Sequence, residues 1–258
     1  MRPGAIGSGV ESGSAVAPIE VFVAPTDGSE LAELGAGVAG HLAERLQATV
    51  RRFSATTDDV VGAIIKEFWQ SENAVLCMAT HEGRRSGVLM GSVAAEVVRR
   101  LHEPLILVGP QVDLDTVARG DRVVACVGPE GSEQVIAPAA EWAERFAVPL
   151  ELVTVVEPVL EAVPGQPVRR HHGPAEPVAY LIELAAKYAP LGMLVTTTVV
   201  EDPIGVAEGV RAHVREHPPV LVVVGSHQRA RIERLVLGDD AADIVHRSPA
   251  GVLVVPLL

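Results

Sequence analysis

Short apolar runs rich in valine alternate along the chain with segments of helical periodicity. In residues 221–256 the pattern of apolar and polar positions predicts a buried strand, a loop ending in glycine, a helix and a second buried strand. Residues 74–110 show the same order, and in both stretches Thr or Ser precedes His after the first strand. We infer an internal duplication. In each copy a loop and a helix N-terminus follow the carboxyl end of a strand, where backbone N–H groups can receive phosphate.

The first repeat is predicted to contain four strands and three helices. Apolar runs predict strands, and an apolar stripe every three or four residues predicts helices. The strands are expected at residues 19–24, 49–53, 75–79 and 105–108, and the helices at 30–47, 56–70 and 91–101.

The second repeat is predicted to contain five strands with a helix between each pair. The strands are expected at residues 122–127, 150–156, 193–200, 220–224 and 252–255. The first helix is expected to follow the turn at 128–132 and to end at about Phe146, and the other helices are expected at 178–188, 204–216 and 239–246. This order is that of a complete doubly wound α/β domain, and continuous apolar strands are typical of parallel sheets covered on both faces. The first repeat lacks one strand–helix pair between its first helix and the helix that starts at Thr56.

The predicted fold class is therefore α/β, with two tandem doubly wound domains, parallel sheets and helices on both faces. We expect a disordered tail at residues 1–17, a shortened first domain at 18–110, a polar and irregular linker at 111–120, and a second domain at 121–258. The last strands of the two domains, 105–108 and 252–255, are apolar enough to be buried. We expect both strands to be covered, because bare edges invite aggregation.

Charge and cysteine content restrict the partners. The formal net charge of −12 argues against nucleic acid or an anionic membrane, since both require a basic patch. No apolar run reaches the roughly 18 residues of a membrane helix. Cys77 and Cys126 each lie in an apolar run, which is typical of buried hydrophobic residues and of a reducing compartment. We therefore expect a cytoplasmic protein.

The turn after the first strand and the start of the helix at residue 91 carry a recognisable pattern. The turn contains Pro25 and Asp27, and the helix opens with Gly91, Ser92 and Val93. With the duplication, these residues resemble a tandem universal stress protein, whose domain is a Rossmann-like, adenine-nucleotide-binding fold. The family pattern for ATP is Gly, two residues, Gly, nine residues, Gly, then Ser or Thr. In such proteins the aspartate turn lies near the adenosine, and the glycine loop and helix N-terminus hold the phosphates. Such proteins also pair domains through their last strands, so the resemblance implies that the strands at 105–108 and 252–255 join the two domains as a pseudo-dimer.

Each repeat departs from this pattern. In the first, Ala79 stands where the first glycine is expected, Glu82 or Gly83 must serve as the second, and the spacing to Gly91 is shorter. The resemblance implies nucleotide contacts at Pro25, Asp27, Ala79, Gly83, Gly91, Ser92 and Val93. In the second repeat Gly225 and Gly238 keep the expected spacing. Gln228 replaces the middle glycine, Glu130 replaces the aspartate, and Asp239-Asp240 replaces the phosphate-capping Ser-Val.

Any nucleotide is therefore expected in the first repeat, because two carboxylates occupy the phosphate position of the second. The implied ligand is ATP or another adenine nucleotide, with no metal beyond the Mg²⁺ that accompanies ATP. The remaining polar motifs are better explained as loops, strand ends and helix starts than as metal sites, catalytic pairs or anion clamps: His171-His172, Thr80-His81, Ser226-His227, Asp58-Asp59, and Arg229, Arg231 and Arg234.

The resemblance implies a regulatory protein of stress response that binds a nucleotide and acts on a protein partner. It does not imply a dedicated enzyme. Two alternatives stay open. One is a ligand-free structural or protein-interaction module with vestigial nucleotide sites. The other is slow ATP hydrolysis, for which the sequence offers no well-placed general base or arginine.

Overall fold

The computed structural model describes residues 17–80, 91–128, 132–156, 176–188, 192–228 and 235–257. Apart from Ala17, the predicted N-terminal tail lies outside these residues. Within them, no helix is both long and apolar enough to cross a membrane.

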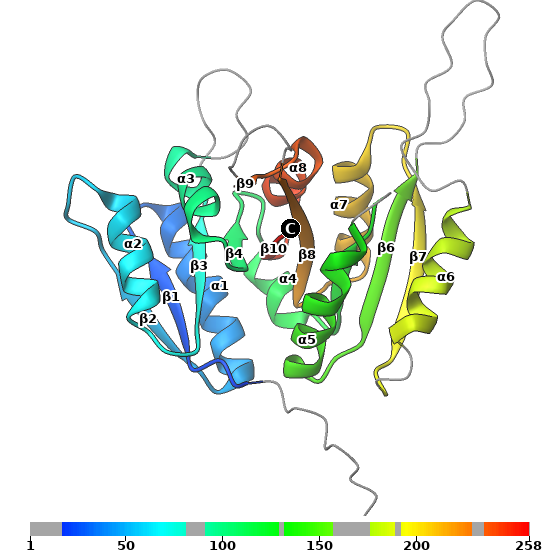
Figure 1. Ribbon diagram of the computed structural model, residues 1–258, viewed down its shortest axis with the longest axis horizontal. Helices are drawn as coiled ribbons and strands as arrows, with labels where there is room; N and C mark the ends of the chain where they lie inside the picture. The colour runs from blue at the N-terminus through cyan, green and yellow to red at the C-terminus, as the bar shows by residue number, and fades with distance from the viewer. Residues whose placement is uncertain are drawn as a thin grey trace, which may run out of the picture.

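The strands form one sheet that runs through the whole molecule (Figure 1). Its order is β2-β1-β3-β4-β10-β8-β5-β6-β7, and β9 pairs with the end of β8. All neighbours are parallel except β4 with β10 and β8 with β9. The bounds are β1 Val21–Pro25, β2 Thr49–Phe53, β3 Ala74–Ala79, β4 Leu105–Val108, β5 Val123–Cys126, β6 Leu150–Val156, β7 Val195–Glu201, β8 Leu221–Gln228, β9 Leu235–Val236 and β10 Val252–Pro256.

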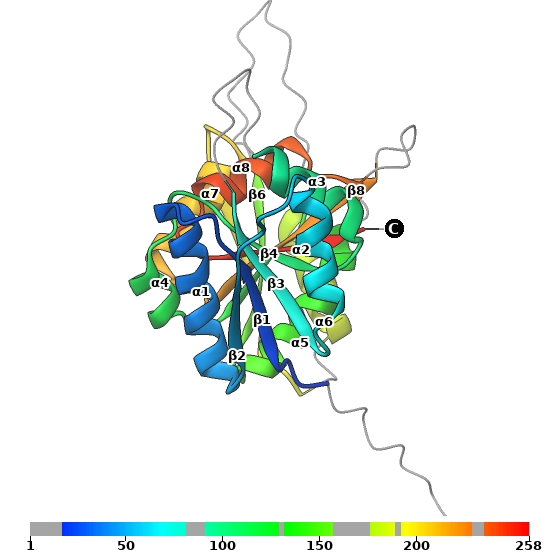
Figure 2. The same ribbon diagram turned by 90° about the vertical axis from the view of Figure 1, so that its left-hand side faces the viewer.

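Helices cover both faces of the sheet. In the first half, α1 (Glu30–Leu46) lies on one face, and α2 (Val60–Trp69) packs beside α3 (Ser92–Leu101) on the other (Figure 2). In the second half, α5 (Ile136–Phe146) follows the short helix η1 (Ser132–Val135) and packs on β5 and β6, and α6 (Pro177–Tyr188) covers β6 and β7. Helices α7 (Val206–Glu216) and α8 (Asp239–Arg247) pack together. The predicted α/β class with a mostly parallel sheet is confirmed.

The two halves share one strand order, except that the first is shorter. In the second half β6 is followed outward by β7, whereas in the first half β2 is the outer strand. The segment from Phe53 to Val60 leads directly from β2 to α2, so counterparts of α6 and β7 are absent at this point. This is within the stretch in which the sequence predicted a missing strand–helix pair.

The two halves meet through their last strands. β4 and β10 pair in antiparallel register, with Val252 opposite Leu107 and Val254 opposite Leu105, and the side chains of β4 are buried. The chain approaches its other half closely here, because a Cβ at Gly109 would overlap the carbonyl oxygen of Val245 in α8. The junction therefore belongs to the hydrophobic core of the molecule.

The segment 111–120 was predicted to be irregular, but it contains a helix. Residues Leu114–Arg119 form the short helix α4, which starts where the carboxylate of Asp113 accepts hydrogen bonds from the N–H groups of Asp115 and Thr116. Helix α4 packs on α1, and the Arg45 guanidinium donates to the carbonyl oxygens of Ala118 and Gly120 at 2.8 and 2.7 Å. Those carbonyls end a helix and need partners, which Arg45 supplies.

Two further element boundaries lie four residues from the predicted ones. Helix α2 starts at Val60 rather than Thr56, because the carboxylate of Asp59 accepts from the N–H of Gly62 at 2.9 Å and caps the helix there. Strand β8 continues to Gln228 instead of ending at residue 224, because β9 pairs with its last residues. The strand therefore runs through Gly225, which the sequence had placed in a binding loop.

Candidate functional site

The turn after β1 is ordered by hydrogen bonds from its own residues. The N–H of Thr26 donates to the carbonyl oxygen of Phe53 at 2.7 Å, and the carboxylate of Asp27 accepts from the N–H of Ser29 at 2.9 Å. Gly28 has a φ of 81°, a conformation that glycine adopts without strain. Ser29 in turn caps α1 by accepting from the N–H of Ala32. Asp27 is thereby held at the carboxyl end of β1.

A pocket of about 250 Å³ lies at the carboxyl ends of β1 and β3. The strand order reverses between these two neighbours, and open α/β sheets bind ligands at such a point. Of the residues predicted from sequence, four line the pocket: Pro25, Asp27, Ala79 and Val93. The other lining residues are Thr26, Ala32, Ala55, Val60, Ile64 and Met78, so the walls are mostly apolar and Asp27 is the acidic group among them.

Helix α3 begins beside this pocket, at Gly91. The N–H of Gly91 donates to the buried Thr80 hydroxyl at 3.4 Å, which ties the start of α3 to the end of β3. The first turn of α3 holds no acidic residue, so its N–H groups keep the partial positive charge of a helix N-terminus. Gly91 and Ser92 precede the lining residue Val93 but do not line the pocket themselves. Gly83 lies outside the described residues.

The corresponding region of the second half differs. Gly225 lies inside β8, and a Cβ there would overlap the side chain of Leu257. Packing between β8 and the chain after β10 therefore favours glycine at this position. Helix α8 starts after Gly238, and the exposed residues Asp239 and Asp240 form its first turn. Their charges oppose an anion at this helix end, as the sequence indicated, while Glu130 lies outside the described residues.

Other candidate chemistry is restricted by burial. Burial raises the pKa of the Cys77 thiol to about 12, and the same cause raises the pKa of Cys126 to about 12, so both stay protonated at neutral pH. The side chain of Ser226 is fully buried and its hydroxyl donates to the carbonyl oxygen of Val255. In the part of the chain that the structure describes, no three His, Cys, Asp or Glu side chains are placed to hold a metal ion. His171-His172 and the arginines at 229, 231 and 234 fall outside that part.

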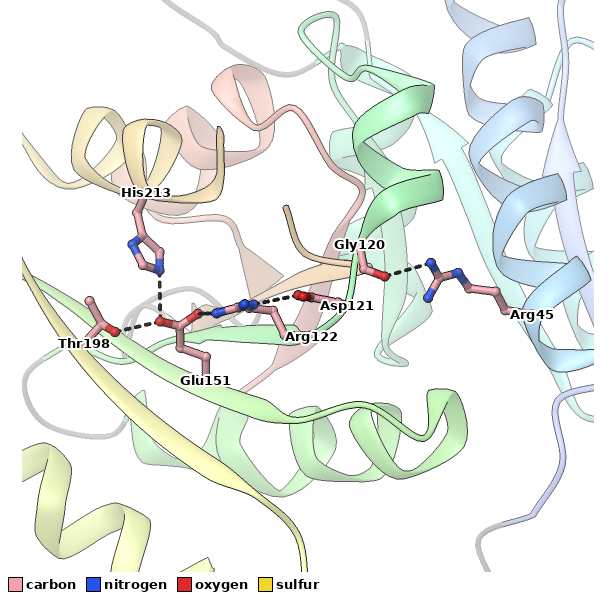
Figure 3. A network of polar contacts seen from close by, with 7 residues as sticks. All are labelled: Arg45, Gly120, Asp121, Arg122, Glu151, Thr198 and His213. Carbon is pink, nitrogen blue, oxygen red and sulfur yellow. Dashed lines mark hydrogen bonds and ion pairs between the residues drawn. The ribbon is translucent and has the colours of Figure 1, made fainter. Parts of the chain in front are cut away.

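Sequence analysis missed a buried polar network in the second half (Figure 3). Glu151 on β6 is only 3% exposed, and its carboxylate accepts hydrogen bonds from the Thr198 hydroxyl at 2.6 Å and from Nε2 of His213 at 3.0 Å. Arg122 lies 3.3 Å from its other oxygen and also contacts Asp121. The available signal was a glutamate inside the apolar strand LELVTVV.

The network determines the charge state of Glu151. Burial alone would raise the pKa of its carboxyl group. The hydrogen bonds from His213, Thr198 and Arg122 together with the charge of His213 outweigh burial and lower the pKa to about 2. The group is therefore ionised at neutral pH and fully partnered. It lies among helices and strands of the second half, so we interpret it as structural.

Comparison with known proteins agrees with this architecture. The model of the universal stress protein family matches residues 120–256, which is more than half of the chain. The chain belongs to the universal stress protein family. Among curated proteins, none matches it.

Solved structures extend the likeness in fold to nearly the whole chain. A universal stress protein from Archaeoglobus fulgidus DSM 4304 is 15% identical with a TM-score of 0.55, covering 92% of this chain and 98% of its own. A functionally unknown protein from Pseudomonas aeruginosa PAO1 is 13% identical with a TM-score of 0.54, covering 93% of both chains. A universal stress protein from Archaeoglobus fulgidus in complex with dAMP is 17% identical with a TM-score of 0.35, covering 53% of this chain and 97% of its own.

Proposed function

We propose that this universal stress protein is a non-enzymatic regulator that holds an adenine nucleotide, ATP among the candidates, in the pocket of its first half. One observation carries the proposal: Pro25, Asp27, Ala79 and Val93, selected from the sequence and drawn from three separate segments, line one pocket. Through the bound nucleotide, the protein would change the surface that it offers to a protein partner.

The chemistry of the pocket suits this ligand. Apolar walls from α2 and β3 can hold a flat base, and the carboxylate of Asp27 can accept hydrogen bonds from ribose hydroxyls. The N-terminus of α3, without acidic residues in its first turn, can receive a phosphate. If ATP is the ligand, Mg²⁺ would accompany its phosphates. Among the lining residues that the structure describes, Asp27 is the only one with an ionisable side chain.

The proposal includes a tandem arrangement. Residues 18–110 would be a shortened second copy of the universal stress domain, joined through the segment 111–120 to the copy at 121–258. The equivalent strand order of the two halves supports this, and the antiparallel pairing of β4 with β10 supports a pseudo-dimer within one chain. The thiols of Cys77 and Cys126 are free, which supports a cytoplasmic location.

The size of the pocket favours one alternative, a protein-interaction module without a ligand. The pocket volume of about 250 Å³ lies below the usual range of roughly 300–1,000 Å³ for ligand sites. Ala79 at the end of β3 replaces a family glycine and adds a side chain to the wall. In this alternative both nucleotide sites are vestigial.

A thermal-shift series distinguishes the two functions. We expect ATP, ADP or AMP, with or without Mg²⁺, to raise the melting temperature of the full chain. A ligand at a hundred times its Kd adds about 2.7 kcal/mol, which corresponds to roughly 5–10 °C for a chain of this size. Guanine nucleotides at the same concentrations serve as the matched control. No shift with either class would favour the ligand-free module, whereas equal shifts with adenine and guanine nucleotides would show that the site does not select the adenine base.

A further inference from the structure

The outer strand β7 leaves backbone groups directed away from the sheet. It ends the strand order, and in the described part of the chain its only neighbour is β6. The N–H of Leu150 donates to the carbonyl oxygen of Leu194, and the N–H of Asp202 donates to that of Val156. Even-numbered residues of β7 therefore face β6. Val195, Thr197 and Val199 direct their N–H and C=O groups outward.

This edge lacks the features that normally prevent strand pairing. The sequence VTTTVVE holds no Lys, Arg or Pro, and its one charge is Glu201 at the end. The opposite outer strand, β2, carries Arg51 and Arg52, which form exposed ion pairs with Glu67 and Glu33. Charged side chains of that kind protect an edge from a second strand. Of the two outer strands, β7 is the one that can accept a partner.

Exposed apolar side chains lie beside the same edge. Val178 and Ile182 on α6 are 57% and 56% exposed, and their spacing of four residues places them on one stripe of the helix. Helix α6 packs on β7, and Leu194, which directly precedes the strand, is 64% exposed. A protein that paired at β7 would therefore also cover apolar surface.

We propose that β7 pairs in antiparallel register with β7 of a second copy of this chain and closes a symmetric dimer. The strand is complementary to itself when the pairing centres on Thr198. Thr197 then lies opposite Val199 of the second copy, and Val195 lies opposite Glu201. No like charges meet in this register, and each outward-directed residue of one strand lies opposite an outward-directed residue of the other. A two-fold axis through this pairing brings the α6 helices of both copies to the same face, where Val178 and Ile182 would meet their copies.

The chain already uses this type of junction, since β4 and β10 join its two halves by antiparallel pairing. The net charge of −12 on each copy opposes association at low ionic strength. The dimer should therefore become tighter as salt screens this repulsion.

Sedimentation velocity on the full chain, from micromolar to near-millimolar concentration and at low and high salt, tests the proposal. We expect a species of twice 27.1 kDa whose fraction rises with concentration and with salt. A chain that stays monomeric over the whole range would overturn the proposal. So would assemblies that keep growing with concentration, because they would indicate open pairing of β7 with β2.

Two variants locate the interface. Thr197→Pro removes an outward N–H and leaves the hydrogen bonds to β6 in place, and we expect it to raise the dimer Kd at least about tenfold. The double variant Val178→Glu, Ile182→Glu leaves the backbone of β7 unchanged and should weaken the dimer similarly. Trp69→Glu, at a 61% exposed residue of α2, is the matched control and should leave the Kd unchanged. Circular dichroism is used to check that each variant is folded. A dimer that survives in folded forms of both interface variants contradicts the assignment.

Discussion

Replacement of Glu151 by alanine is expected to lower the free energy of unfolding by about 3 kcal/mol at pH 7. The substitution removes the acceptor for the Thr198 hydroxyl, for Nε2 of His213 and for the Arg122 guanidinium. The His213 and Thr198 groups then lose their partner in a largely buried site, and such groups are costly to leave unpaired. Urea denaturation monitored by circular dichroism measures the difference.

The control is Glu141→Ala on α5. Glu141 also pairs with an arginine, Arg145, but its side chain is 47% exposed, and such surface pairs contribute at most about 1 kcal/mol. If both substitutions lower the stability equally, the network around Glu151 has no special role.

The contribution of Glu151 should also depend on pH. Its carboxyl pKa is about 2 in the folded protein and 4.5 in an unperturbed glutamate. The ionised group therefore stabilises the fold above pH 4.5, and this stabilisation is lost as the pH falls toward 2. The titratable and charged groups that face it are His213 from α7 and Arg122 before β5, which Asp121 contacts in turn. We expect the stability difference between the wild type and Glu151→Gln to fall to roughly half between pH 7 and pH 3. A difference that stays constant with pH would show that the charge is not stabilising.

Substitution of Gly91 by aspartate is expected to weaken nucleotide binding about tenfold to a thousandfold while leaving the protein folded. Gly91 is the N-cap residue of α3 with φ −60° and ψ 149°, a conformation that aspartate adopts readily and in which it caps a helix well. Its carboxylate would then occupy the N–H groups proposed for phosphate, and like charges about 4 Å apart cost on the order of 1–4 kcal/mol. Equilibrium binding of labelled ATP measures the change.

Gly238→Asp is a closely matched control. Gly238 is the N-cap residue of α8 with nearly the same backbone angles, φ −62° and ψ 159°, and a Cβ there meets no neighbour within 4 Å. We expect this variant to bind as the wild type does. Loss of binding in Gly238→Asp with retention in Gly91→Asp would move the site to the second half.

The order and type of the elements were predictable, because strands such as β4 and helices such as α1 carry strong periodic patterns. The shorter features were not. Helix α4 has six residues, too few for a periodic signal, and its position depends on the contact between Arg45 and the carbonyls of Ala118 and Gly120.

The candidate site was predictable in part for a similar reason. Pro25 and Ala79 end β1 and β3, whose carboxyl ends lie side by side, so topology brings them together. Asp27 lies in the turn after β1, and Val93 lies in the first turn of α3, which follows β3 in the chain. Gly225 shows that the spacing of two glycines does not by itself identify a binding loop. It keeps the family interval to Gly238, but it lies inside β8 and a Cβ there would press on the side chain of Leu257, which only the folded chain brings near. Glu151 went unnoticed because its partners come from three distant segments.

The number of adenine nucleotides bound per chain tests the central claim most directly. Isothermal titration calorimetry of the full chain with AMP, ADP and ATP gives this number together with the affinity. Our account predicts one nucleotide per chain, held in the pocket beside Asp27 and bound more weakly in Gly91→Asp. Two nucleotides per chain, or no heat at millimolar nucleotide, would contradict it.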